Sequence, residues 1–384
     1  MMNKILEPFK RISWKYLINY IAVAIVGLIF TALTLSSGLP QSTLFLLEKI
    51  TMNIILVVSL SLVVGFLGEL SLGHAGFMCV GAYIGGKVAC ILSESIDGDG
   101  IVSFLIALLV GAAVAGAFGF IIGLPALRLK GDYLAIVTLA FGEIVKTVFA
   151  NSSEDTFGGS MGLRTPRFEK QYLFILGFVL VLLTLAVVQN LIRSKHGRAI
   201  TAIRDNEIAA RATGINVTKY KLIAFVISAV FAGVAGVFYS FANSTVKASV
   251  FDYNYSIDIL IMVVIGGMGN IGGAIISATA ITYINTELQT LLTGGAAVYK
   301  DIIYALILIA IIIYNNAPAL KSFRERFNLK ALLKKTKLFN KSRQGYADDE
   351  GKWDRVPTKI DMDELLSVDV NVVESVKNPD KEEM

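Results

Sequence analysis

The sequence predicts an all-α polytopic membrane protein. Hydrophobic residues make up 55% of the 384 positions and charged residues only 17%, and the mean hydropathy is +0.66. These values lie far outside the range of soluble globular domains. The apolar residues also gather into long runs, separated by short charged or glycine-rich passages. A run of about 20 apolar residues is long enough to cross a bilayer as one helix.

Hydropathy predicts about ten transmembrane helices. The first follows Lys4, Lys10, Arg11 and Lys15, and it is too long for the apolar part of a secretory signal, so we expect an uncleaved helix. Small residues recur every fourth position inside two of the runs, which predicts closely packed helix faces. They are Ala115, Gly119 and Gly123 in one run and Ala229 and Gly233 in another. The ten helices are predicted at approximately residues 16–35, 50–67, 74–93, 101–124, 132–150, 172–192, 221–242, 256–268, 271–290 and 298–315.

The charges between the runs predict the orientation of the chain. Positive residues favour the cytoplasmic side, so the acidic passage 94–100 should lie outside and Arg128 and Lys130 inside. Ten helices that start from a cytoplasmic N-terminus satisfy both conditions and place the C-terminus in the cytoplasm as well. We therefore expect a transmembrane domain over 1–316 and a cytoplasmic tail over 317–384, which is basic first, then acidic, and partly disordered. The net charge of +5 follows from this topology, so no nucleic-acid partner is predicted.

Two glycine-rich passages predict interruptions of helices, near 68–74 and near 266–272. Irregular backbone at membrane depth is tolerated only where it is buried in protein or lines a cavity. The second passage matches the dinucleotide-binding pattern GxGxxG, but its flanks are apolar helices and no βαβ unit follows. We expect a tight, re-entrant turn there instead, formed by Gly266, Gly267, Gly269 and Gly272.

No catalytic, metal or nucleotide site is predicted in this chain. A P-loop-like passage at 81–88 has Val88 where the magnesium-binding Ser or Thr should stand. The two histidines, His74 and His196, lack a partner at zinc-binding spacing, and no nucleophile elbow or HExxH helix is present. We therefore expect a protein that is not an enzyme and binds no cofactor, so that any ATP chemistry must reside on another subunit.

The passage 193–221 is the one long, strongly charged segment between two apolar runs. It holds seven Lys or Arg and two acids, which predicts a cytoplasmic loop. Within it Asp205 could cap a short helix, Glu207 and Arg211 are spaced for an ion pair, and Gly214 could end the helix in the left-handed conformation. The basic residues at its edges, including Lys219 and Lys221, are expected mainly to set orientation. We predict a short amphipathic helix that meets a cytosolic partner.

Polar residues inside the predicted helices are candidates for a solute path. Glu143 lies in the middle of the fifth helix with Lys146 one turn beyond, and an intramembrane carboxylate is costly unless it faces the protein interior and is paired. The sequence is compatible with two roles for Glu143, a structural ion pair and a direct part in the solute path. The candidate path residues are Ser71, Gly73, His74, Tyr133, Thr138 and Glu143.

Taken together, five passages give the sequence a resemblance to the permease subunits of bacterial branched-chain amino acid ABC importers, of the LivM type. They occur in family order and the resemblance covers roughly residues 16–316. The passages are GELSLGHAGFMCVGAY at 68–83, LRLKGDYLAIVTLAFGEIVK at 127–146, GGSMGL at 158–163, HGRAITAIRDNEIAARATGINVTKYKLIAFVISAVFAGVAGVFYS at 196–240 and GGMGNIGGAIISA at 266–278.

The resemblance implies a multi-pass protein of the bacterial cytoplasmic membrane that imports Leu, Ile or Val. It also implies a second homologous permease subunit, two cytosolic ABC ATPases that bind ATP and Mg, and an extracytoplasmic amino-acid-binding protein. The short loop helix looks like the EAA-like element that docks on the ATPase, although Ile208 follows Glu207 and the glycine comes one residue late. The residues expected to couple to the ATPase are Arg204, Asp205, Glu207, Ala209, Ala210, Arg211 and Gly214.

Three other functions are compatible with the sequence. A related importer for urea or short-chain amides would share all these features, because apolar path residues do not reveal the substrate. A secondary transporter could use Glu143 or Asp258 to couple to an ion gradient, although matched half-repeats with broken helices are not evident. A receptor or scaffold without solute flux is the third alternative.

Overall fold

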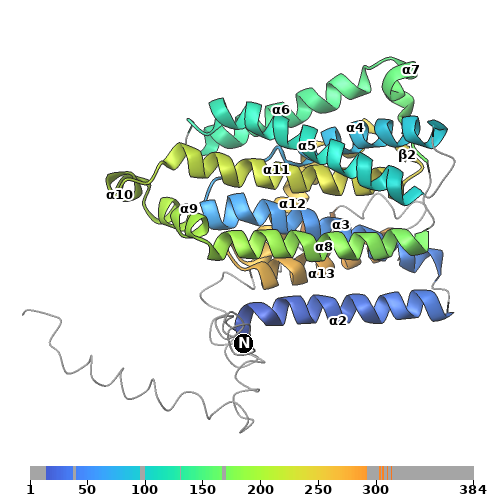
Figure 1. The fold of residues 1–384 in the computed structure, drawn as a ribbon, viewed down its shortest axis with the longest axis horizontal. Coiled ribbons are helices and arrows are strands. Elements are labelled where there is room, and N and C mark those ends of the chain that lie inside the picture. The colour runs from blue at the N-terminus through green and yellow to red at the C-terminus, as the bar shows by residue number, and fades with distance from the viewer. Residues whose placement is uncertain are drawn as a thin grey trace, which may run out of the picture. The chain divides into compact units, whose positions relative to one another are not determined.

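The structure of the chain is a computed structural model. It describes residues 14–37, 40–95, 100–129, 131–166 and 170–291, together with isolated positions between 302 and 313. The chain divides into two compact units, residues 1–312 and 313–384. The first unit is a bundle of long helices that lie side by side (Figure 1). The predicted tail, 317–384, lies outside the described residues.

Long helices dominate the first unit, which confirms the predicted fold class. They are α2 (Trp14–Ser37), α3 (Gln41–Ser61), α4 (His74–Ser95), α5 (Gly100–Ala126), α6 (Asp132–Ala150), α8 (Lys170–Arg193), α11 (Val217–Ala242), α12 (Tyr253–Gly266) and α13 (Ile271–Leu291). Within the described ranges, seven helical stretches are long and apolar enough to cross a membrane, and α2 adds a shorter apolar stretch, Val23–Thr34. The predicted helix at 298–315 lies almost wholly outside the described residues, so the count of ten stays a prediction.

Helix α11 is the centre of the core. It packs against α4, α5 and α3, and nearly all side chains along its middle are buried. Gly233 of α11 lies against the backbone of Gly81 on one side and against Ala115 on the other, and a methyl group added at Gly119 would meet Ala229 at 2.5 Å. Helices approach this closely only where the facing residues are small, so the predicted small-residue faces are confirmed.

The predicted interruption near 68–74 is confirmed. Helix α3 continues into a π-helix, η2 (Leu62–Leu67), which ends at Gly68 in the left-handed conformation with φ of 80°. Irregular backbone follows until α4 begins at His74. π-Helical turns are rare in proteins and often occur at functional sites. We refer to residues 62–73 as the hinge segment.

The predicted tight turn near 266–272 is also present, but it is shorter than the four glycines suggest. Helix α12 includes Gly266, the turn contains Gly267 and Gly269 at positive φ, and α13 already begins at Ile271. Gly272 therefore lies inside α13 rather than in the turn. The Gly267 carbonyl closes the turn by accepting a hydrogen bond from the Asn270 amide at 3.0 Å.

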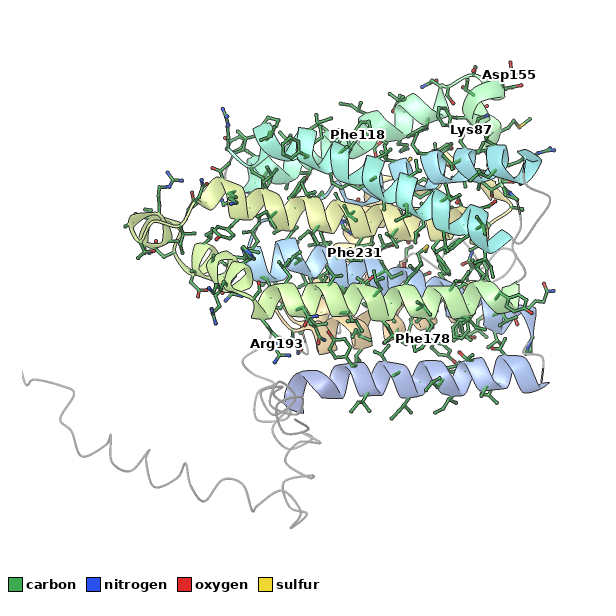
Figure 2. All side chains as sticks on the ribbon, in the orientation of Figure 1. Lys87, Phe118, Asp155, Phe178, Arg193 and Phe231 are labelled. Carbon is green, nitrogen blue, oxygen red and sulfur yellow. The ribbon has the colours of Figure 1, made fainter. Side chains whose placement is uncertain are left out.

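Short elements gather at the two opposite ends of the bundle (Figure 1). At one end lie α7 (Glu154–Phe157) and a two-stranded antiparallel sheet, with Leu163 paired to Val246. At the other end lie α9 and α10, which connect α8 to α11. The remaining short elements are η3 (Gly159–Met161), β1 (Leu163–Arg164), β2 (Thr245–Val246) and η4 (Ala248–Val250). Figure 2 shows Lys87 and Asp155 at the α7 end, where the Lys87 ammonium donates to the Asp155 carbonyl at 3.2 Å, and Arg193 toward the α9 end.

Candidate functional site

The charged loop between α8 and α11 folds into two short helices, α9 (Lys195–Asp205) and α10 (Glu207–Ala212). The hydroxyl of Ser194 caps α9 by accepting from the amides of His196 and Gly197, at 3.1 and 3.3 Å. The predicted short helix therefore exists, and a second one precedes it. Helix α10 lies at the tip of this end of the bundle (Figure 1).

The cap of α10 is Asn206, not Asp205 as the sequence suggests. The Asn206 side-chain oxygen accepts from the Ala209 amide at 3.0 Å. Asp205 is still the last residue of α9, and its carboxylate receives the guanidinium of Arg204 at 2.9 Å. Because Asn and Asp are equally good caps, the two neighbours could not be separated by propensity. The extended backbone of Asn206, with φ of −159°, decides which one caps.

The predicted end of α10 at Gly214 is confirmed. Gly214 has φ of 85°, its amide donates to the Arg211 carbonyl at 3.1 Å, and the Ile215 amide donates to the Ala210 carbonyl at 3.0 Å. This pair of bonds is the Schellman motif, in which a glycine in the left-handed conformation closes the helix.

The two faces of α10 differ in character. Ile208 is 80% exposed and Ala209 is also exposed, whereas Ala210 is buried against the bundle. The predicted ion pair is present, because Arg211 donates to the Glu207 carboxylate at 2.9 Å. Ile208 and Ala209 therefore form the outward face of α10, and Ala210 forms its inward face.

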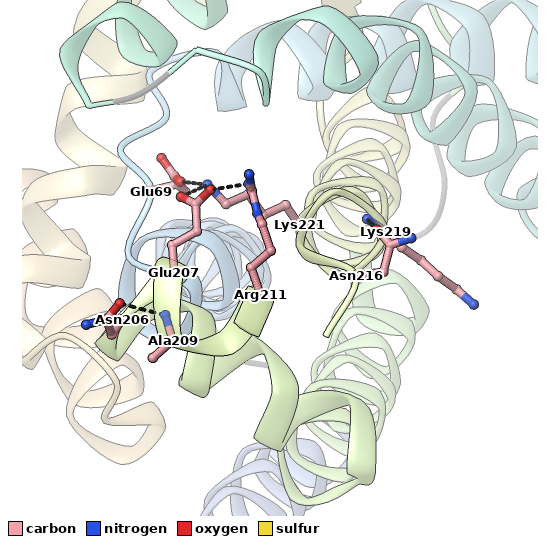
Figure 3. Close-up of polar contacts among 8 residues, drawn as sticks. All are labelled: Glu69, Asn206, Glu207, Ala209, Arg211, Asn216, Lys219 and Lys221. Carbon is pink, nitrogen blue, oxygen red and sulfur yellow. Dashed lines mark hydrogen bonds and ion pairs between the residues drawn. The ribbon is translucent and has the colours of Figure 1, made fainter. Parts of the chain in front are cut away.

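Glu207 is the outer member of a network of four charges (Figure 3). The ammonium of Lys221, at the start of α11, donates to the Glu207 carboxylate at 3.2 Å and to the carboxylate of Glu69 in the hinge segment. Two carboxylates and two cations, counting Arg211, make the network neutral. The Lys221 side chain is only 4% exposed. Lys221 is thus a buried ion-pair residue and not simply a positive flank that sets orientation.

Arg204 provides a second connection between this loop and the hinge segment. Its guanidinium donates to the Gly65 carbonyl at 3.1 Å, while it also holds Asp205. Gly65 lies in the last turn of η2, where backbone carbonyls have no partner within the helix and can accept from an outside donor. The aliphatic part of Arg204 also lies against Gly68, where an added methyl group would come within 2.6 Å of it.

The candidate path residues do not form one cluster. The hydroxyl of Thr138 on α6 accepts from the Leu72 amide at 3.0 Å, and the backbone of Gly73 lies against Thr138. Ser71 and His74 are buried, and His74 is hydrogen-bonded to the Ser59 hydroxyl at 3.0 Å. Gly73 and Thr138 therefore hold the hinge segment against α6, and His74 connects α4 to α3.

Tyr133 and Glu143 lie away from that cluster, on the exposed side of α6. Tyr133 is 70% exposed, whereas the Glu143 side chain is 34% exposed, so Glu143 is only partly buried in this chain. Its predicted ion pair with Lys146 is present at 3.0 Å. Its second oxygen accepts from the Tyr253 amide at 3.1 Å, which connects α6 to the start of α12.

Sequence reasoning missed the partnership of Glu69 with Lys221 and a polar contact among three helices. The Tyr255 hydroxyl donates to the Asn53 side chain at 3.0 Å, and Asn53 donates to the Thr282 hydroxyl at 2.7 Å. The only signal for either was an isolated polar residue next to an apolar run, which does not reveal its partner.

Comparison with known proteins identifies the family of the chain. Residues 42–312 match the family described as branched-chain amino acid transport system / permease component. The chain is 34% identical over 296 residues to the high-affinity branched-chain amino acid transport system permease protein LivM of Escherichia coli K12, covering 69% of this chain and 68% of that one. Identity to LivM of Salmonella typhimurium is 36% over 62% of this chain and 61% of the relative.

A more distant relative has a different substrate in its name. The ribose import permease protein RbsC of Escherichia coli K12 is 28% identical over 77% of this chain and 92% of its own length. No solved structure is significantly similar to the chain.

Proposed function

Because the chain belongs to the family of branched-chain amino acid transport permease components, we propose that it forms part of the membrane path of an ABC importer for Leu, Ile or Val. It is a multi-pass membrane protein of a transport system, and it supplies the path and a docking loop. ATP and Mg belong to two separate ATPase subunits, and α10 and both termini lie in the cytoplasm.

The observation that carries the proposal is the exposed, doubly capped helix α10 at the tip of one end of the bundle. Asn206 and the Gly214 turn fix a helix that is too short to be stable alone. Ile208, Ala209 and Arg211 face outward and form the contact surface for the ATPase. Arg204, Glu207, Ala210 and Gly214 lie behind this surface and position α10 on the bundle. Asp205 contributes a surface ion pair with Arg204.

The exposed side of α6 is proposed to face the solute path and the second permease subunit. A carboxylate that is one-third exposed in the middle of an apolar helix is costly against lipid, about 2.5–3.5 kcal/mol on insertion scales. A protein partner or a water-filled path covers it at lower cost. We therefore favour Glu143 and Tyr133 as residues that line the path. The other four candidates support the helices behind this surface, and they are Ser71, Gly73, His74 and Thr138. The extracytoplasmic binding protein would dock at the opposite end, on α7 and the β1–β2 sheet.

Purification from native membranes in mild detergent tests the composition of the complex. We expect a second permease of similar sequence and two ABC ATPase subunits to co-purify with the chain. A chain that purifies alone and still catalyses uptake driven by an ion gradient would overturn the proposal in favour of a secondary transporter.

Transport by the purified complex tests the substrate. Proteoliposomes that carry ATP on the ATPase side, without an ion gradient, should take up leucine when the binding protein is added on the other side. Ribose and urea are the matched comparisons, because a ribose permease is among the relatives and a urea importer would share the same features. Uptake of urea or ribose without leucine would contradict the assigned substrate, and no flux of any solute would favour a receptor or scaffold.

A further inference from the structure

The hinge segment, residues 62–73, is bound at two points, to the docking loop, which comprises residues 194–216 with helices α9 and α10, and to Lys221 near the start of α11. Arg204 of α9 holds the Gly65 carbonyl at 3.1 Å. Further along the segment, the Glu69 carboxylate is bound by Lys221, which also binds Glu207 of α10 at 3.2 Å. Any displacement of α9 or α10 therefore acts on this segment through two separate polar contacts.

The far end of the hinge segment is bound to the path helices. The Leu72 amide donates to the Thr138 hydroxyl of α6 at 3.0 Å, and Gly73 lies in backbone contact with the same residue. Just beyond, the Ala75 amide donates to the Ser256 hydroxyl of α12 at 3.0 Å. Helices α6 and α12 are the two that meet at Glu143. One short irregular segment thus connects α10 to the helices on either side of that carboxylate.

The charge distribution makes the network sensitive to what touches α10. Lys221 is buried and serves two carboxylates, of which Glu69 is 13% exposed and Glu207 is 23% exposed. The second cation, Arg211, is 68% exposed and stands on the outward face. A partner that draws Arg211 away from Glu207 removes one of the two cations that the described part of the chain brings into this network. Glu207 is largely buried and then depends more strongly on Lys221, so such a change redistributes the contacts of Lys221 between Glu69 and Glu207.

We propose that the Glu69–Lys221–Glu207 network transmits the movement of α10 to the hinge segment, and through it to α6 and α12. The proposal rests on the proposed function and names the residues that couple ATP hydrolysis to opening of the path. Glu69 and Lys221 are thus positioning residues for transport, which act through the hinge segment and do not touch the substrate. Arg204 supports the same connection from α9.

Glu69→Gln is the informative substitution, because it removes the charge that binds Lys221 to the hinge segment and leaves the ion pairs of Glu207 with Lys221 and Arg211 in place. Lys219→Gln is the matched control, since Lys219 is an exposed cation two residues from Lys221 and points away from the network (Figure 3). The complete complex of each variant is reconstituted with its partners. Three quantities are measured: ATPase subunits bound per permease, ATP hydrolysis, and leucine uptake per ATP hydrolysed.

The expected result is a change in coupling without a change in assembly. Glu69→Gln should bind the ATPase subunits normally and hydrolyse ATP, while uptake per ATP falls about tenfold. Lys219→Gln should stay within about twofold of the unmodified complex in all three quantities, as expected for an exposed charge. Lys221→Gln repeats the test from the other side of the same contact, and Lys221→Arg should restore part of the coupling.

Two results would overturn the inference. Normal uptake per ATP in Glu69→Gln would show that the network is only a structural contact. A parallel loss of ATPase binding and uptake in Glu69→Gln would show that the substitution impairs docking or folding and not coupling. Failure of the unmodified complex to take up any branched-chain amino acid with ATP would instead overturn the proposed function, and the inference with it.

Discussion

The side-chain oxygen of Asn206 accepts a hydrogen bond from the amide of Ala209 at 3.0 Å, and this contact begins α10. A helix of six residues forms few internal hydrogen bonds, so its stability depends on its ends and on its packing. Here one end has a side-chain cap, the other has the Gly214 turn, and Ala210 supplies the buried contact. The helical conformation of α10, and with it the docking surface, therefore depends mainly on these two caps.

Replacing Asn206 with Ala should weaken the complex with the ATPase subunits. Loss of a helix cap costs about 1 kcal/mol, which corresponds to about a fivefold loss of binding if α10 must be helical to dock. Asp205→Ala is the control, because its 68% exposed carboxylate pairs with Arg204 at the surface and such pairs contribute little. Titration of the ATPase subunit onto the purified permease measures both. An Asp205→Ala variant that loses more affinity than Asn206→Ala would contradict the assigned cap.

Substitution of Gly214 should separate backbone strain from steric clash. A methyl group at Gly214 would meet nothing within 4 Å, and φ is +85°, so the only cost is the left-handed conformation. For Ala that cost is about 1–2 kcal/mol, and for Asn it is smaller because Asn adopts this conformation more readily. We expect Gly214→Ala to reduce ATPase binding several-fold, about as much as loss of the cap, and Gly214→Asn to retain most of it. Equal loss in both variants would indicate that the partner needs the space above Gly214.

The sequence predicts local features of this site well and distant contacts poorly. The spacing of Glu207 and Arg211, the glycine at 214 and the breaks near 68 and 267 all follow from patterns within a few residues, and all are present. The bond between Glu69 and Lys221 joins residues 152 positions apart, which no local pattern contains. Lys221 also stands where positive residues normally set topology, so its burial could be seen only in the folded chain.

Replacing Glu143 with Gln should impair transport and leave assembly unchanged. The substitution removes the charge that pairs with Lys146 at 3.0 Å, and the neutral amide can still accept from the Tyr253 amide. If the exposed side of α6 lines the path, we expect the leucine concentration for half-maximal uptake to rise about tenfold, or ~1.4 kcal/mol. Glu287→Gln is the control, because Glu287 is a partly exposed carboxylate near the end of α13, outside both α6 and the proposed docking surfaces. Unchanged uptake in Glu143→Gln would exclude Glu143 from the path.

Tyr255→Phe should lower the thermal stability of the permease without changing its topology. The Tyr255 hydroxyl of α12 donates to Asn53 of α3, which in turn donates to Thr282 of α13. Loss of the hydroxyl leaves the Asn53 oxygen without this donor in a buried site, at a cost of about 1 kcal/mol for a contact between membrane helices. In a chain of this size that corresponds to a fall in Tm of about 1–2 °C. Tyr253→Phe is the matched control, because Tyr253 lies two residues away and is half-exposed. Thermal unfolding in detergent compares the two, and an equal fall in Tm for both variants would contradict a stabilising role for the bond to Asn53.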